Sequence, residues 1–190
     1  MAMTPFGTQV DPTSGVLEPA EEVGQRYLSD MAGMYADPDA VERILNDDGD
    51  RLIYEVYAAS VPEGEGQVKH STTVIHPGTV GDEFHMTKGH FHTKRDRGEV
   101  YFGLSGEGYL LMQTDDGKAD HVYMKPGTAA YVPPYWAHRT VNTGEEPFTF
   151  FAAWPGDAGH DYGTIEELGF AKLILDRDGE VAIVDNTMHR

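Results

Sequence analysis

Cysteine is absent from this chain of 190 residues. Its absence excludes disulfides, thiolate metal ligands and cysteine nucleophiles, and it suits a cytoplasmic location. Long apolar runs are also missing, since no segment reaches the roughly 18 apolar residues that a membrane helix needs. The N-terminus has neither a basic region nor an apolar core, so we expect no signal peptide.

Positive charge is scarce as well. The chain has 14 lysines and arginines against 32 aspartates and glutamates, which gives a formal net charge of -18. Nucleic acids and membranes are not expected as partners, because binding to nucleic acids or anionic membranes requires clusters of Lys and Arg. An anionic small molecule is compatible with this charge if local donors and a bound cation overcome the overall field.

The pattern along the chain favours a single all-β domain over residues 1–190. Residues 1–50 form an N-terminal extension in which residues 1–36 are predicted to be irregular. A short helix follows, with Asp37 as its N-cap and Pro38 at its first position. From residue 52 the hydrophobic period becomes two, in short strands separated by turns rich in Gly, Pro and Asp. We therefore expect residues 51–190 to form an antiparallel sandwich or barrel.

Three histidines and a glutamate stand out in this β region. Side chains at positions i and i+2 of a strand face the same side, so His90 and His92 can face one interior. Glu99 begins the next predicted strand, and His138 follows a proline-rich turn. Each histidine alone has an ordinary structural explanation. Together, three imidazoles and one carboxylate suit a divalent ion such as Fe, Ni, Zn or Mn.

The spacing of these residues resembles the two motifs of the cupin superfamily. Residues 90–106 are similar to the first motif, although the gap before Glu99 is longer than is common. Residues 127–142 are similar to the second motif, with Tyr135 in place of the usual glycine. The resemblance implies a double-stranded β-helix, or jelly-roll barrel, with one or two small helices.

Longer segments resemble the cupin-type phosphoglucose isomerases over nearly the whole chain. These segments are residues 5–7, 28–31, 54–57, 87–92, 131–142, 157–163 and 184–186. The resemblance implies a cytoplasmic, homodimeric enzyme of glycolysis and gluconeogenesis that interconverts glucose 6-phosphate and fructose 6-phosphate. It also implies one divalent ion per chain, with iron expected first and nickel, manganese or zinc as alternatives. The implied metal ligands are His90, His92, Glu99 and His138.

The implied reaction moves a hydrogen between C2 and C1 of the open-chain sugar. In a cis-enediol route, a metal stabilises the charge on the sugar oxygens and a carboxylate transfers the proton. By resemblance, Glu99 is that carboxylate, and His160 and Tyr162 complete the catalytic set. A metal-assisted hydride shift is the competing route, which the sequence does not separate from the first.

No glycine-rich phosphate loop is present, so hydroxyl and backbone N–H groups must bind the substrate phosphate. By resemblance, these groups come from Tyr54, Thr73, Thr87 and Gly89, with Lys88 beside them. From the residues alone, Thr73 and Thr87 are better explained as β-forming residues, and only the resemblance favours a role in phosphate binding.

Two further positions resemble the family's residues around the sugar. Tyr135 is one of them, although it could instead pack beside the preceding prolines. Trp154 stands where the family more often has tyrosine, and an indole keeps a hydrogen-bond donor but loses the acceptor. His160 could also serve only to order its loop. Tyr101 and the other strand aromatics are predicted to be core or dimer contacts.

Two other functions remain open at this point. One is a different metal-dependent cupin enzyme, such as a dioxygenase. The other is a non-catalytic sugar-binding cupin, which predicts the loss of a metal ligand or of residues 87–89, yet both are intact. The use of mannose 6-phosphate is also open, because that sugar differs from glucose 6-phosphate only in the orientation of one hydroxyl.

Overall fold

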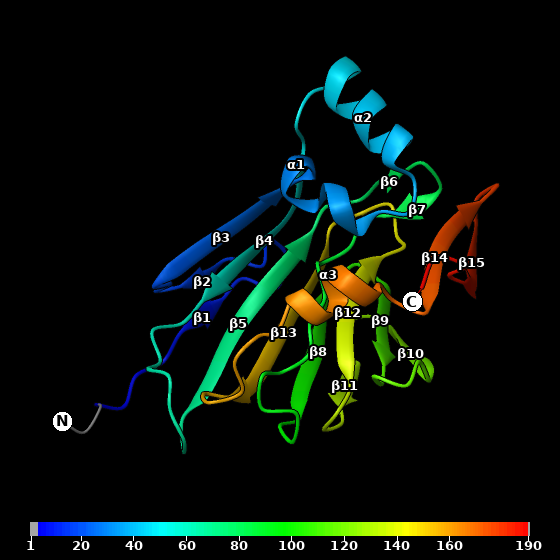
Figure 1. Ribbon diagram of the computed structural model, residues 1–190. Coiled ribbons are helices and arrows are strands. Elements are labelled where there is room, and N and C mark those ends of the chain that lie inside the picture. The colour runs from blue at the N-terminus through cyan, green and yellow to red at the C-terminus, as the bar shows by residue number, and fades with distance from the viewer. Residues whose placement is uncertain (1–3, 190) are drawn as a thin grey trace.

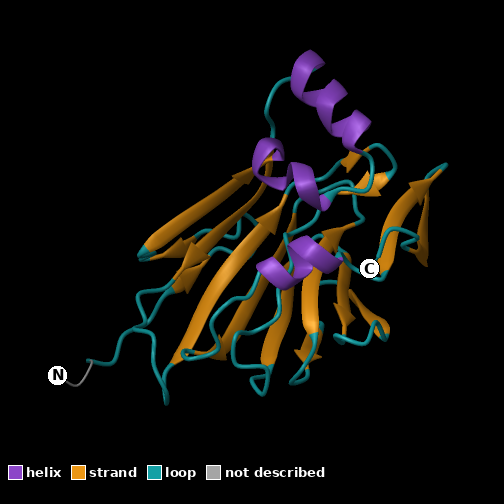
Figure 2. Ribbon diagram, in the orientation of Figure 1, coloured by secondary structure: helices purple, strands orange, loops and turns teal. Residues whose placement is uncertain are grey.

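The computed structural model describes residues 4–189. The all-β prediction is confirmed, because antiparallel sheets make up most of the regular secondary structure and three short α-helices and one 3-10 turn lie around them (Figures 1 and 2). The strands are β1 (Gln9–Val10), β2 (Leu17–Glu18), β3 (Glu22–Tyr27), β4 (Leu52–Ala58), β5 (Val68–Ile75), β6 (Thr79–Val80), β7 (Glu83–Phe84), β8 (Glu99–Ser105), β9 (Gly108–Gln113), β10 (Ala119–Met124), β11 (Ala129–Val132), β12 (Ala137–Asn142), β13 (Phe148–Pro155), β14 (Lys172–Arg177) and β15 (Glu180–Asp185).

The largest sheet has six strands in the order β11-β8-β13-β5-β4-β3, and a three-stranded sheet has the order β10-β9-β12. Their buried faces share one apolar cluster, to which Phe148 and Phe150 of β13 and Leu110 and Leu111 of β9 belong. A four-stranded sheet, β15-β14-β7-β6, and the β1-β2 pair complete the fold. Residues 178–179 form the β14–β15 hairpin turn with positive φ at both positions, as the Asp-Gly pair predicts.

The predicted helix is confirmed as α2 (Pro38–Asp47), which stands at one end of the molecule in Figure 1. The Asp37 side chain accepts a hydrogen bond from the Ala40 backbone N–H at 2.9 Å, which caps the first turn. The other helical segments are α1 (Leu28–Met31), η1 (Ala32–Met34) and α3 (Gly163–Leu168). Within residues 4–189, no helix combines the length and apolar character that crossing a membrane requires.

The prediction that residues 1–36 are irregular is wrong, because β1, β2 and β3 lie there. β3 pairs with β4 from Glu22 opposite Ala58 to Tyr27 opposite Leu52, and so it forms one edge of the six-stranded sheet. Five of its six residues are exposed, so its sequence shows no clear apolar alternation. Pairing of the backbone with β4 defines this strand, and a hydrophobic pattern could not predict it.

Candidate metal centre and its cavity

The four predicted ligand residues converge inside the sandwich. One possible ligand atom from each of them lies within 4.8 Å of the others. His90 and His92 come from an extended segment, Glu99 is the first residue of β8, and His138 is the second residue of β12. The backbones of His90 and His138 exchange two hydrogen bonds, of 3.1 and 3.0 Å, which hold the segment against β12.

The hydrogen bonds around the cluster fit a bound divalent ion. The Nε2 atoms of His92 and His138 lie 3.0 and 3.1 Å from the same Glu99 oxygen, Oε2. His92 donates from Nδ1 to the Arg97 carbonyl at 2.9 Å, which leaves its Nε2 free to bind a metal. His90 Nε2 is buried and has no hydrogen-bond partner within residues 4–189. A buried, unsatisfied imidazole nitrogen beside a carboxylate is costly unless a ligand completes it.

The charge states also fit metal binding. Burial, together with the neighbouring histidines, lowers the pKa of His90 well below its usual value, so its imidazole is neutral. Burial by itself would raise the pKa of Glu99, but the hydrogen bonds and charges of His138 and His92 lower it to about 2. The cluster therefore offers an ionised carboxylate and a neutral imidazole at neutral pH, as a divalent ion requires.

A cavity of about 330 Å³ opens beside this cluster. Three neighbouring strands line it with alternate residues, because every second side chain of a strand faces the same side. These residues are Tyr54, Val56 and Ala58 of β4, Lys69, Ser71 and Thr73 of β5, and Phe150, Ala152 and Trp154 of β13.

The structure brings most of the predicted site residues to this cavity. Besides His90, Glu99 and His138, the predicted residues that line it are Tyr54, Thr73, Thr87, Lys88, Gly89, Trp154, His160 and Tyr162. Tyr135 does not line it. This side chain is 61% exposed, and its backbone N–H donates to the Arg95 carbonyl at 2.6 Å. The φ of +71° at Tyr135 lies where glycine is favoured, which agrees with the glycine usual in the second cupin motif.

His160 and Tyr162 lie on a loop that closes over the cluster. The ring centroids of His160 and Tyr162 are 4.5 and 5.3 Å from that of His90. Ion pairs hold the loop in place, with Asp161 accepting from Arg95 Nη2 at 2.6 Å and Asp157 from Arg97 Nη2 at 2.9 Å. Phe91 and Asp161 also exchange two backbone hydrogen bonds. Burial is the main cause that lowers the pKa of His160, so this imidazole is neutral at pH 7.

Tyr101 also lines the cavity, a placement that the sequence analysis missed. Its ring centroid lies 5.7 Å from that of His138, and its side chain is 6% exposed. Burial, together with the nearby Glu99 carboxylate, raises the pKa of Tyr101 well above its usual value, so the phenol keeps its proton. The available signal was its position two residues after Glu99 in one strand, which puts both side chains on the same face.

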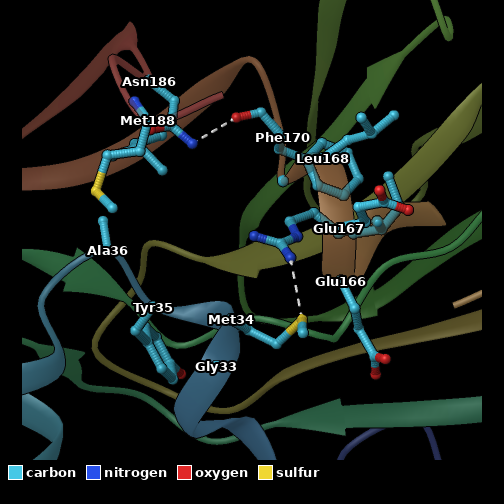
Figure 3. A pocket seen from close by; sticks show the side chains of 14 residues that line it. Gly33, Met34, Tyr35, Ala36, Glu166, Glu167, Leu168, Phe170, Asn186 and Met188 are labelled. Atoms are coloured by element: carbon cyan, nitrogen blue, oxygen red, sulfur yellow. Dashed lines mark hydrogen bonds between the residues drawn. The ribbon is translucent and has the colours of Figure 1, made fainter. Parts of the chain in front are cut away.

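A second cavity, of about 310 Å³, lies on the other side of β12. Figure 3 looks into it, with Met34 and Tyr35 on one wall and Leu168 and Phe170 opposite. Arg139 also lines this cavity. Further lining residues are Gly33, Ala36, Ile165, Glu166, Glu167, Gly169, Leu173, Asn186 and Met188.

Arg139 connects this second cavity to residues 87–89 of the first. Its Nη2 donates to the Lys88 carbonyl at 2.7 Å, and its Nη1 donates to Met86 Sδ at 3.0 Å. The guanidinium also lies 4.3 Å from the centre of the Phe170 ring. Gly89 has a φ of +75°, and a Cβ added there would lie 2.7 Å from Phe170 Cε2, so only glycine fits.

Comparisons with known proteins give a consistent result. Residues 25–189 match the model of a protein family described as glucose-6-phosphate isomerase. The chain is 53% identical over 182 residues to a glucose-6-phosphate isomerase of Thermococcus gammatolerans, covering 96% of this chain and 95% of that one. Identity to the enzyme of Pyrococcus horikoshii is 53% over 186 residues, covering 98% of this chain and 97% of that one.

The chain is also similar to a more distant relative and to a solved structure. A glucose-6-phosphate isomerase of Sinorhizobium medicae is 37% identical over 176 residues, which cover 93% of this chain and 82% of that one. Among solved structures, the chain overlaps with an oxalate decarboxylase of Bacillus subtilis at a TM-score of 0.44 and 22% identity. That overlap covers 56% of this chain and 27% of the other.

Proposed function

The chain belongs to the glucose-6-phosphate isomerase family, and from this premise we propose that glucose 6-phosphate and fructose 6-phosphate are interconverted in the cavity beside Glu99. One observation carries the proposal. A single cavity combines a cluster of three histidines and a glutamate with hydroxyl and backbone groups that can bind a phosphate. A dioxygenase would need the cluster of histidines and glutamate but not the groups that can bind a phosphate.

His90, His92, Glu99 and His138 would hold the metal ion, for which we propose iron, with nickel, manganese and zinc as alternatives. When bound, a divalent ion supplies Lewis-acid stabilisation of negative charge on the sugar oxygens. The four residues would offer it one carboxylate and three imidazoles. The hydrogen bond from His92 Nδ1 to Arg97 keeps one of these imidazoles in the required orientation.

Glu99 is the proposed proton carrier. One oxygen of its carboxylate would take the proton from C2 of the open-chain sugar and return it to C1. Despite burial, the hydrogen bonds and charges of His138 and His92 lower the pKa of Glu99 to about 2, so this group is ionised and can accept a proton. A hydride shift between the two carbons stays as the competing route. The protonated phenol of Tyr101 lies beside the same carboxylate and can donate a hydrogen bond to it.

His160 and Tyr162 are proposed to orient the sugar and to exchange protons with its hydroxyl groups. Their loop carries a neutral imidazole and a phenol, and both lie beside the candidate metal ligand His90. Trp154 faces His160, with ring centroids 6.0 Å apart, and its indole N–H can donate to a sugar oxygen.

The substrate phosphate is proposed to bind at the end of the cavity that Tyr54, Thr73 and residues 87–89 line. Burial is the main cause that raises the pKa of Tyr54, to about 12, so this phenol is a hydrogen-bond donor at neutral pH. Thr140 N–H donates to Thr87 Oγ1 at 3.1 Å, which orients that hydroxyl while its proton remains available to the phosphate.

We also propose that the enzyme works in the cytoplasm, in glycolysis and gluconeogenesis, as a homodimer. The outer face of β8 and β11 supports a dimer, because Val100, Phe102 and Tyr131 are 46%, 41% and 57% exposed there. Exposed apolar side chains that are grouped on one sheet face mark interaction surfaces. Sedimentation of the purified chain would test this assembly directly.

The catalytic proposal is tested by Glu99→Gln. The amide has nearly the shape of the carboxylate but cannot take a proton, so we expect turnover to fall by about 10²–10⁴-fold. Fructose 6-phosphate conversion is measured in a coupled assay, and bound metal is measured on the same preparation. Wild-type turnover in a metal-loaded Glu99→Gln variant would remove Glu99 as the base. Wild-type activity that survives thorough metal removal would overturn the whole scheme.

A further inference from the structure

Three cationic side chains line the cavity beside Glu99, and two of them already have an acidic partner. Lys69 Nζ lies 3.5 Å from Glu63 Oε1, and Lys88 Nζ lies 3.9 Å from Glu166 Oε1. Arg26 is the third. Within residues 4–189, its guanidinium has no carboxylate oxygen within 4.0 Å. The partner that does bind it is a backbone carbonyl, since Nη1 donates to the Gln25 oxygen at 2.8 Å.

The position of Arg26 is set by the pairing of β3 with β4. Arg26 lies directly opposite Tyr54, and Glu22, Gly24 and Arg26 all line the cavity because they alternate along β3. Glu22 is four residues away, which is about 13 Å along a strand, so it is too distant to neutralise Arg26. The guanidinium therefore stands beside one of the proposed phosphate donors.

Electrostatic effects agree with this placement. Burial is the main cause that raises the pKa of Tyr54 and of Tyr162, while the positive charge of Arg26 acts in the opposite direction on both phenols. The guanidinium is thus close enough to influence two phenols at the cavity. Among residues 4–189, Arg51, Lys118, Lys125 and Arg139 also lack a carboxylate oxygen within 4.0 Å, but of these five cations it is Arg26 that lines the cavity beside Glu99. In a chain with a net charge of -18, its charge there offsets the field that repels an anion.

We propose that Arg26 binds the phosphate group of the hexose phosphate and makes the cavity selective for phosphorylated sugars. This inference rests on the proposed isomerase function and adds a residue to it. A guanidinium can form two parallel hydrogen bonds to phosphate oxygens, and its weak hydration lowers the cost of bringing it to an anion. The metal ligands and Glu99 act at the reacting carbons, whereas Arg26 acts at the opposite, charged end of the substrate.

The test compares Arg26→Met and Arg26→Lys with a control, Lys125→Met, which removes one exposed positive charge away from both cavities. We expect Arg26→Met to raise the KM for fructose 6-phosphate by about 10- to 100-fold, because a charged hydrogen bond is lost. Turnover at saturation should stay near the wild-type value. Arg26→Lys should show a smaller rise in KM, and Lys125→Met should show almost none.

A binding measurement keeps this inference separate from the isomerase proposal. Titration calorimetry with inorganic phosphate should give weaker binding to Arg26→Met than to wild type by a factor similar to the rise in KM. Equal phosphate affinity in the two proteins would overturn the role of Arg26. A fall in turnover with an unchanged KM would also overturn it. A wild-type protein that binds phosphate through Arg26 but shows no isomerase activity when metal-loaded would instead refute the proposed function.

Discussion

The two cavities on either side of β12 differ little in volume, about 330 and 310 Å³, but they differ greatly in chemistry. Thr140 lines the first and the adjacent Arg139 lines the second, as alternation along a strand requires. The first holds converging imidazole, carboxylate and hydroxyl groups. In the second, Nη1 and Nη2 of Arg139 are bound by Met86 and Lys88, whereas Arg139 Nε and the Tyr35 hydroxyl are buried without a partner among residues 4–189. The convergence of three imidazoles and one carboxylate on one point, rather than cavity size or a single unpaired donor, therefore identifies the binding site.

The largest expected difference between the cavities is their response to metal removal and to pH. Acid should abolish metal binding, because a proton and a metal ion compete for the same imidazole nitrogen. Burial lowers the pKa of His92, but the Glu99 carboxylate more than compensates and raises it above the ordinary value of about 6.5. Metal affinity should therefore increase as the pH rises through the raised pKa of His92.

Metal binding to the chelated protein can be titrated at several pH values to check this prediction. Tyr35→Phe in the second cavity serves as the control, and it should leave the pH dependence unchanged. Metal affinity that is constant across the acidic and neutral range would contradict binding by these histidines. Metal binding with no recovery of activity would separate the metal site from catalysis.

A smaller effect is expected from Arg139→Met, which breaks the contact between the cavities. Without the hydrogen bond to the Lys88 carbonyl, residues 87–89 should lose their fixed position. We expect the KM for fructose 6-phosphate to rise by about 10-fold while turnover stays nearly constant, since a charged hydrogen bond contributes roughly 1.5–3 kcal/mol. The kinetic constants and the bound metal should be measured together. Loss of metal would instead show that Arg139 supports the whole of β12.

Sequence reasoning located the first cavity better than the second, for physical reasons. His90 and His92 are two residues apart, and local strand geometry alone places them on one face. Glu99 and His138 followed from their spacing in recognisable motifs. Arg26 and Arg139 gave no such signal, because their roles depend on what lies across a strand pair or a layer. Likewise, β3 is defined by its pairing with β4, which no local pattern of its exposed residues encodes.

The loop over the first cavity gives a further, smaller prediction. Asp161 accepts hydrogen bonds from Arg95 and from the hydroxyl of Thr164, both at 2.6 Å, and so it holds the loop that carries His160. Asp161→Asn should lower turnover by about fivefold at most, because partly exposed ion pairs contribute only about 1 kcal/mol. Bound metal should be unchanged. A loss of turnover as large as that of Glu99→Gln would mean that Asp161 takes part in the chemistry.

The smallest effect is expected inside the second cavity, from Leu173→Ala. Leu173 lines that cavity and is half-buried, so its truncation removes apolar packing without changing residues 87–89 or the candidate metal ligands. The free energy of unfolding should fall by about 1 kcal/mol, as measured by denaturant titration. The KM and the turnover should both match wild type. A change in KM here, without one in Lys125→Met, would show that the second cavity influences the first beyond the contact that Arg139 makes.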